Sequence, residues 1–143
     1  MTVRHLRRTP DARRLLLIFT GWSTDARLFR GREFPAGWNA TVCSGFDGTP
    51  VPPEELDGYD TIYVLAWSLG VAAAADLLPP DKITAAFAVN GTERPADDLM
   101  GIPEAIFRGT RDNLSPRNLV KFRRRVAGSA EAFAALADAL PEV

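Results

Sequence analysis

The segment TIYVLAWSLGVAAAADLLPP, residues 61–80, decides the fold. Its first part, Thr61–Trp67, is rich in β-branched and aromatic residues, a composition that predicts a buried strand. The alanine-rich part that follows Ser68 predicts a helix, and the two prolines at its end cannot continue that helix. The sequence therefore places Ser68 on a tight turn between a strand and a helix.

The five residues Ala66–Gly70, AWSLG, are similar to the nucleophile elbow Gly-x-Ser-x-Gly, in which a sharp turn exposes a serine at the end of a strand. Ala66 replaces the first glycine and is small enough for such a turn. The alanines Ala72–Ala75 would let the following helix approach the sheet closely. The alternative interpretation is that Ser68 only caps the helix, and that the TGW segment of residues 20–22 is an ordinary turn.

An acyl-transfer site also needs an oxyanion hole, usually built from the N–H after the nucleophile and an N–H from a loop that follows an earlier strand. Leu69 follows Ser68 directly. The loop FTGWST follows the first apolar run, and Trp22 is its candidate donor. We therefore expect Trp22 and Leu69 to form the oxyanion hole.

Other apolar runs of strand length occur at Leu15–Phe19, Asn39–Phe46 and Ile83–Gly91. Residues 24–31 predict a short helix capped by Thr24 or Ser23, and the proline-rich residues 47–60 predict a loop without regular structure. Alternating strands and helices predict an open, mostly parallel α/β sheet.

From Pro103 onward the pattern becomes helical, in residues 103–113, 115–129 and 130–140. Ser115 followed by Pro116 predicts the start of a helix, and Gly128 predicts its end. We expect a single domain, in which residues 1–102 form the sheet core and residues 103–143 form a helical, lid-like block over its edge or top.

The composition is that of a soluble globular protein, with 143 residues, 46% of them apolar and 24% charged. The run LLLIF is too short to predict a signal segment and no apolar run has membrane-spanning length, so a cytoplasmic location is expected. Cys43 is the single cysteine, which excludes an internal disulfide and offers no metal cluster. We expect no metal or cofactor, and the net charge of −1 favours neither nucleic acid nor a membrane as partner.

Several segments occur together in one order: IFTGWSTD, YDTIYVLAWSLGVAAA, AVNGTERPADDLMGIPEAIFRGTRDNLS and LVKFRRRVAGS. Together they resemble the BioG-type pimeloyl-ACP methyl ester carboxylesterases of biotin synthesis, an α/β-hydrolase family. Residues 90–103 are the most distinctive part. The resemblance implies that Ser68 is the nucleophile, with Trp22 and Leu69 in the oxyanion hole. The reaction it implies is hydrolysis of the methyl ester of pimeloyl carried on acyl carrier protein (ACP).

The sequence departs from the family in its catalytic partners. α/β-Hydrolases order their triad as serine, acid and histidine, but the only histidine here is His5. His5 lies in the basic, polar residues 1–14, and we interpret it as a surface or disordered histidine. We interpret Asp112 as part of a lid helix, and Asp97 and Asp98 as Asx-type turn residues. The resemblance thus covers the front part of the family and lacks its last strands, so we expect the chain alone to be a very poor esterase.

The predicted helix at residues 115–129 is amphipathic, with apolar residues on one face and cations on the other. Because ACP is strongly acidic, the cationic face could steer it to the site, although a simply solvated face is the alternative. The cationic face consists of Arg117, Lys121, Arg124 and Arg125.

Three hypotheses follow from the sequence. The first is a serine carboxylesterase acting on a small ester, in shortened or split form. The second is a non-catalytic module that binds an acyl or ACP partner, and the third is a pseudo-enzyme completed by another chain. An uncovered sheet edge would also make a homodimer plausible.

Overall fold

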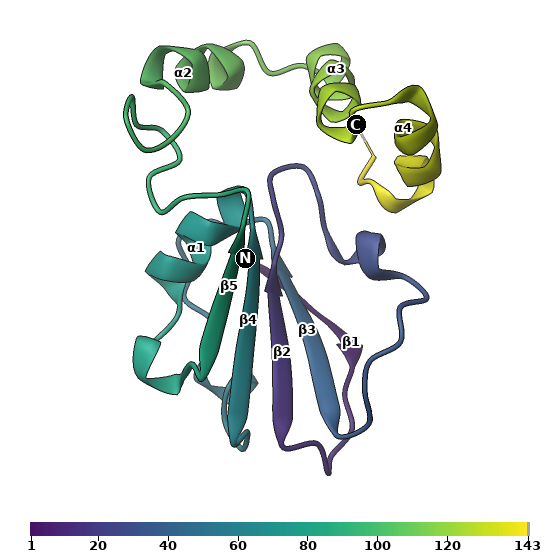
Figure 1. Ribbon diagram of the computed structural model, residues 1–143, viewed down its shortest axis with the longest axis vertical. Helices are drawn as coiled ribbons and strands as arrows, with labels where there is room; N and C mark the ends of the chain where they lie inside the picture. Colours follow the sequence, from purple (N-terminus) through teal and green to yellow (C-terminus); the bar gives the residue numbers. More distant parts are fainter. Residues whose placement is uncertain (143) are drawn as a thin grey trace.

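The computed structural model describes residues 1–142, which form a five-stranded sheet with helices on one face and over one end (Figure 1). The strands are β1 (Thr2–Arg7), β2 (Arg14–Phe19), β3 (Trp38–Ser44), β4 (Thr61–Trp67) and β5 (Ala85–Val89). The helices are α1 (Leu69–Leu77), α2 (Glu104–Asp112), α3 (Pro116–Ala127) and α4 (Ala130–Leu136). Short 3-10 turns lie at η1 (Ala26–Phe29), η2 (Pro53–Glu55), η3 (Pro80–Lys82) and η4 (Ala137–Ala139).

The strand order is β1-β3-β2-β4-β5, and the pairs among β2, β3, β4 and β5 are all parallel. The register pairs Phe19 of β2 with Cys43 of β3 and with Ala66 of β4, so these three strands end at the same level. The mostly parallel α/β sheet expected from the sequence is confirmed. The loops that follow β2 and β4 therefore lie together at the carboxyl end of these strands.

The central strand β2 anchors the core. Leu15, Leu17 and Phe19 are completely buried, and Ile62 and Val64 of β4 pack beside them. Each such side chain contributes about 1.5–3 kcal/mol when it leaves water. The apolar run of β2 is nearly continuous because a parallel strand inside the sheet is covered on both faces.

Of the two interpretations of His5, the surface position is confirmed and disorder is not, because His5 is exposed on an ordered strand. Residues Thr2–Arg7 form β1, which pairs antiparallel with β3 at the edge of the sheet. The register shifts between His5 and Arg7, which breaks the alternation of side chains that identifies a strand in a sequence. An edge strand with one solvated face also carries charged residues that mask it.

Two smaller expectations also need correction. The turn at Ala26–Phe29 is capped by Asp25 rather than by Thr24 or Ser23, because the Asp25 carboxylate accepts a hydrogen bond from the Arg27 N–H. The proline-rich loop contains one short regular turn, Pro53–Glu55, which starts with proline at its first position.

The three C-terminal helices α2, α3 and α4 lie over the carboxyl ends of the strands, whereas α1 lies on a face of the sheet (Figure 1). The expected caps of α3 are present: the Ser115 hydroxyl accepts a hydrogen bond from the Asn118 N–H, and Gly128 ends the helix in the left-handed conformation. The predicted helical block is confirmed, and it covers the end of the sheet where Ser68 lies.

Strand β5 is left uncovered at the other edge of the sheet. Phe87 is 56% exposed and Val89 is 42% exposed, although both belong to a parallel strand. Leu99, Met100 and Ile106, further along the chain, are exposed as well. The described residues therefore present an apolar edge of the kind that a further strand or partner normally covers.

Candidate active site

Ser68 lies in a strained turn between β4 and α1. Its φ is 54° and its ψ is −123°, a conformation that costs a non-glycine residue about 1–3 kcal/mol. The residue occupies the N-cap position of α1, but its hydroxyl accepts no hydrogen bond from the first turn of that helix. Helix capping therefore does not account for the residue or for its strain.

Three glycines make room for this turn. A Cβ atom on Gly70 would overlap the backbone oxygen of Phe19, and one on Gly91 would overlap the backbone oxygen of Ser68. A Cβ atom on Gly21 would lie 3.1 Å from the Ser68 Cβ and 3.6 Å from its hydroxyl oxygen. The serine is thus enclosed by backbone from the loop after β2, the start of α1 and the segment after β5.

The loop after β2, residues 20–24, is held by its own threonines. The Thr20 hydroxyl donates to the Thr24 carbonyl at 3.0 Å, and the Thr24 hydroxyl donates to the Gly21 carbonyl at 2.7 Å. Among residues 1–142, neither the Trp22 N–H nor the Leu69 N–H donates to another backbone group. Two amides without a backbone acceptor, one in the loop after β2 and one directly after Ser68, are what an oxyanion hole requires.

A cavity of about 380 Å³ opens between Ser68 and the lid helices. Trp22, Trp67 and Asn90 line its floor beside Ser68. The lid side is mostly apolar and consists of Phe122, Arg123, Val126, Ala127, Phe133, Leu136 and Leu140. A partly open, mainly apolar space over a strained serine fits an aliphatic acyl chain.

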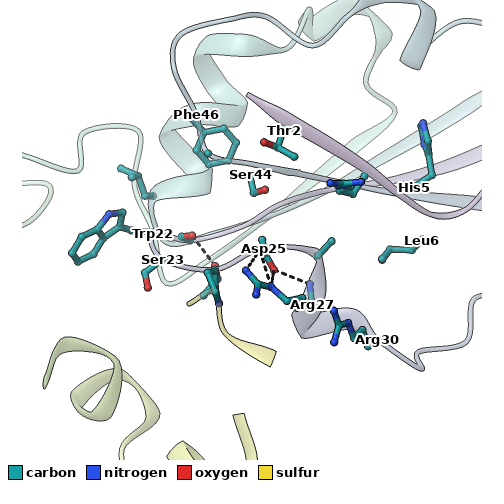
Figure 2. Close-up of a pocket in the computed structure, with 17 residues that line it drawn as sticks. Thr2, His5, Leu6, Trp22, Ser23, Asp25, Arg27, Arg30, Ser44 and Phe46 are labelled. Carbon is teal, nitrogen blue, oxygen red and sulfur yellow. Dashed lines mark hydrogen bonds and ion pairs between the residues drawn. The ribbon is translucent and has the colours of Figure 1, made fainter. Parts of the chain in front are cut away.

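A second, more polar cavity of about 980 Å³ lies on the other side of the Trp22 loop (Figure 2). It contains the ion pair between Asp25 and Arg27, in which the hydrogen bond from Arg27 lowers the pKa of the Asp25 carboxyl. In Figure 2 the Trp22 ring points away from the middle of this cavity, and His5 lies at its opposite end. Gly21, Trp22, Ser23 and Thr24 line both cavities, so this loop separates them.

Arg123 is a site residue that the sequence reasoning missed. It is only 8% exposed, and its guanidinium donates hydrogen bonds to the Ser23 hydroxyl, the Ser23 carbonyl and the Pro141 carbonyl. Burial, followed by the charge of Arg27, lowers the pKa of Arg123. The signal that could have found it is its helical position among Leu119, Phe122 and Val126, where a cation interrupts the apolar face.

His5 has partners of its own on β1. Its Nδ1 lies 3.1 Å from the Thr41 hydroxyl, and its Nε2 lies 2.7 Å from an Arg8 nitrogen and 3.5 Å from a Glu55 oxygen. Ser68 is not among the residues that line the cavity beside His5. The structure therefore does not bring His5 and Ser68 together.

Asp112 and Asp97 have the structural roles that the sequence interpretation expected, whereas Asp98 contacts the start of α2 instead of closing an Asx-type turn. Asp112 is exposed at the end of α2 and pairs with Arg111. The Asp97 carboxylate accepts from the Leu99 and Met100 N–H groups, and the Asp98 carboxylate accepts from the Glu104 N–H. These aspartates stabilise turns and one helix start, and neither cavity is lined by them.

The outer face of α3 carries the predicted cations. Arg117, Lys121, Arg124 and Arg125 are all exposed, and within residues 1–142 none of them forms an ion pair. The Arg124 guanidinium lies 5.3 Å from the centre of the Phe133 ring. We call these four residues the basic ridge; they remain available for a negatively charged partner.

No group of three histidine, cysteine, aspartate or glutamate side chains in residues 1–142 is placed to hold a metal ion. In the same residues, no helix has the length and apolar character needed to cross a lipid bilayer.

The parallel sheet, the strained serine after β4 and the lid over the strand ends define a protein of the α/β-hydrolase type. The model of one family, described as pimeloyl-ACP methyl esterase BioG, matches residues 1–139, and the chain belongs to this family.

Similar proteins agree with this assignment. The crystal structure of BioG from Haemophilus influenzae superposes with a TM-score of 0.82 at 31% identity, over all of this chain and 65% of that one. An uncharacterized protein of Haemophilus influenzae is 36% identical over 83% of this chain and 55% of its own length. A malonyl-[acyl-carrier protein] O-methyltransferase of Bacteroides fragilis is 39% identical over 93% of this chain. The chain spans only 27% of that last protein.

Proposed function

We propose that this chain carries the nucleophile, oxyanion hole and lid of a serine carboxylesterase that hydrolyses the methyl ester of pimeloyl-ACP. The observation that carries the proposal is the Ser68 turn, which is strained, uncapped and enclosed by glycines. Strain of this kind persists where function needs it, because a relaxed serine would be more stable. The match to the BioG family supplies the substrate class.

In the proposed reaction the Ser68 hydroxyl oxygen attacks the ester carbonyl and loses its proton to a base. The negative charge that develops on the carbonyl oxygen is stabilised by the Trp22 and Leu69 amides. Methanol leaves, and water then releases the free carboxylate from the acyl-enzyme. The apolar cavity beneath the lid holds the aliphatic chain during these steps.

The base and the acid that orients it are not assigned to this chain. His5 is its only histidine and is engaged on β1. We propose that a histidine outside this sequence completes the site. Without it, Ser68 keeps only the oxyanion hole and binding, which supply a residual rate enhancement of roughly 10³–10⁴ over water.

The proposed partner is ACP, whose acidic surface would meet the basic ridge, and this partner implies a cytoplasmic location. The ridge lies on α3, directly above the cavity that Phe122 and Arg123 of the same helix line. A carrier bound there would stand close to the entrance that its acyl group must reach.

The missing base favours a second candidate function, a non-catalytic module that binds an acyl or ACP partner. A fluorophosphonate probe separates the two. An activated serine forms a bond to phosphorus and expels fluoride, and we expect slow modification located at Ser68 by peptide mass spectrometry.

The variant Ser68→Ala should not be modified, and His5→Gln should react as fast as the natural chain. A chain that never reacts at Ser68, at any probe concentration, would favour the binding module. Equal modification of Ser68→Ala would show that the reaction occurs elsewhere.

A further inference from the structure

Arg123 is a buried charge whose hydrogen-bond partners all lie outside its own helix. Its Nε donates to the Ser23 hydroxyl at 2.6 Å and its Nη2 to the Ser23 carbonyl at 3.3 Å. Its Nη1 donates to the Pro141 carbonyl at 2.7 Å. A buried cation is expensive unless it is well paired, so these three bonds fix where α3 can lie.

Ser23 is the residue that receives two of these bonds, and its backbone is strained. Its φ is 68°, in the left-handed region that residues other than glycine rarely adopt. Because Arg123 binds both the hydroxyl and the carbonyl of Ser23, it holds the side chain and the backbone of this one residue together. Such a conformation persists only where its surroundings determine it.

The neighbouring residues repeat this connection. Trp22 precedes Ser23, and its ring meets the ring of Phe122, which precedes Arg123, edge to face at 4.7 Å. Two consecutive lid residues therefore hold two consecutive residues of the loop after β2. One of those two, Trp22, is the residue whose amide we assigned to the oxyanion hole.

We propose that Arg123 is a positioning residue of the oxyanion hole. By clamping Ser23, it orients the Trp22 N–H toward Ser68, and the hole is complete only while α3 is docked on the loop. The catalytic half of this inference rests on the proposed function, whereas the clamp itself does not. Lysine cannot replace Arg123, because it lacks the planar fork that reaches Ser23 and Pro141 at once.

Amide NMR spectra test the clamp without any need for activity. In Arg123→Met, and to a lesser extent in Ser23→Ala, the amide signals of Trp22, Ser23 and Thr24 should shift. The signals of the sheet should stay in place. The matched control is Arg108→Met, which removes an exposed lid arginine from α2 and should leave the loop signals unchanged. Unmoved Trp22 and Ser23 signals in folded Arg123→Met would overturn the proposal.

The rate of Ser68 modification by a fluorophosphonate tests the catalytic half. The rate at saturating probe should fall at least about tenfold in Arg123→Met and nearly as far in Arg123→Lys, since removing one oxyanion donor costs roughly 10²–10³. The half-saturating probe concentration should stay the same, because the loss is confined to the transition state.

The possible results keep the two proposals apart. If the natural chain does not react with the probe, both the proposed function and the catalytic role of Arg123 are contradicted. The amide shifts then still show whether Arg123 holds Ser23 in place. A shifted loop with an unchanged rate overturns the catalytic half alone.

Discussion

Gly70 shows at the scale of a single residue how the chain makes room for its site. A Cβ atom there would overlap the backbone oxygens of Phe19 and Thr20, directly before the loop that carries Trp22. We expect Gly70→Ala to lower the free energy of unfolding by about 1–3 kcal/mol, because backbone cannot easily move aside. Urea denaturation would measure the change as a lower midpoint.

Gly109 provides the matched control, because it is also a helical glycine but has open space around it. Gly109→Ala should raise the free energy of unfolding by up to about 1 kcal/mol through helix propensity. A free energy of unfolding that rises in Gly70→Ala, as it should in Gly109→Ala, would contradict the close approach of α1 to β2.

Local patterns predicted the residues around the elbow well. The bounds of the strand Thr61–Trp67 are confirmed, since a β-branched run and a glycine-terminated turn are signals within a few residues. Arg123 could not be predicted in this way. Its partner Ser23 lies 100 residues away in the chain, and only the fold brings the two together.

At the scale of elements, continuous apolar strands were predictable and the mixed edge strand was not. The strands β2, β3, β4 and β5 lie inside the expected runs or within one residue of them. The sequence did not predict β1, because this strand is polar on its exposed face and its register shifts beside His5. Helix α3 was predicted with both caps because Ser-Pro and glycine are strong boundary signals.

The basic ridge of α3 yields a prediction for partner binding. Reversing two of its charges in Arg124→Glu/Arg125→Glu should weaken ACP binding roughly tenfold or more and flatten its dependence on salt. The physical reason is that these cations attract an acidic carrier over a distance that salt screens. Titration calorimetry or surface plasmon resonance at several salt concentrations would measure both effects.

The control applies the same change of net charge at the other end of the sheet. Arg13 and Lys82 are exposed and form only surface ion pairs, which contribute little to stability. Arg13→Glu/Lys82→Glu should leave ACP binding nearly unchanged. Equal losses in the two double variants would mean that net charge, rather than the ridge, governs binding.

At the scale of the whole molecule, the sheet has one masked edge and one open edge. β1 closes one side with charged side chains, whereas β5 exposes Phe87 and Val89. The sequence predicted an uncovered edge because the family order places the acid and the histidine after this point. The association of two copies through this edge stays a prediction, which light scattering of the purified chain would test.

The same open architecture explains why the sequence could predict the nucleophile but not its base. Ser68 is specified by its own turn, while a triad histidine is delivered by an element far along the chain. The BioG crystal structure matches this whole chain with only 65% of its residues, so that relative contains segments without a counterpart here. We therefore propose that Ser68 is a nucleophile prepared for a base that this sequence does not contain.

Chemical rescue by imidazole tests that claim most directly. Free imidazole can enter the space left by a missing histidine and accept the proton of the serine. In the hydrolysis of dimethyl pimelate, imidazole should accelerate the natural chain and His5→Gln alike, and it should leave Ser68→Ala at the uncatalysed background. The acceleration should grow as pH rises through the pKa of free imidazole, because the neutral form is the base. Equal rates for the natural chain and Ser68→Ala at every imidazole concentration would contradict the claim.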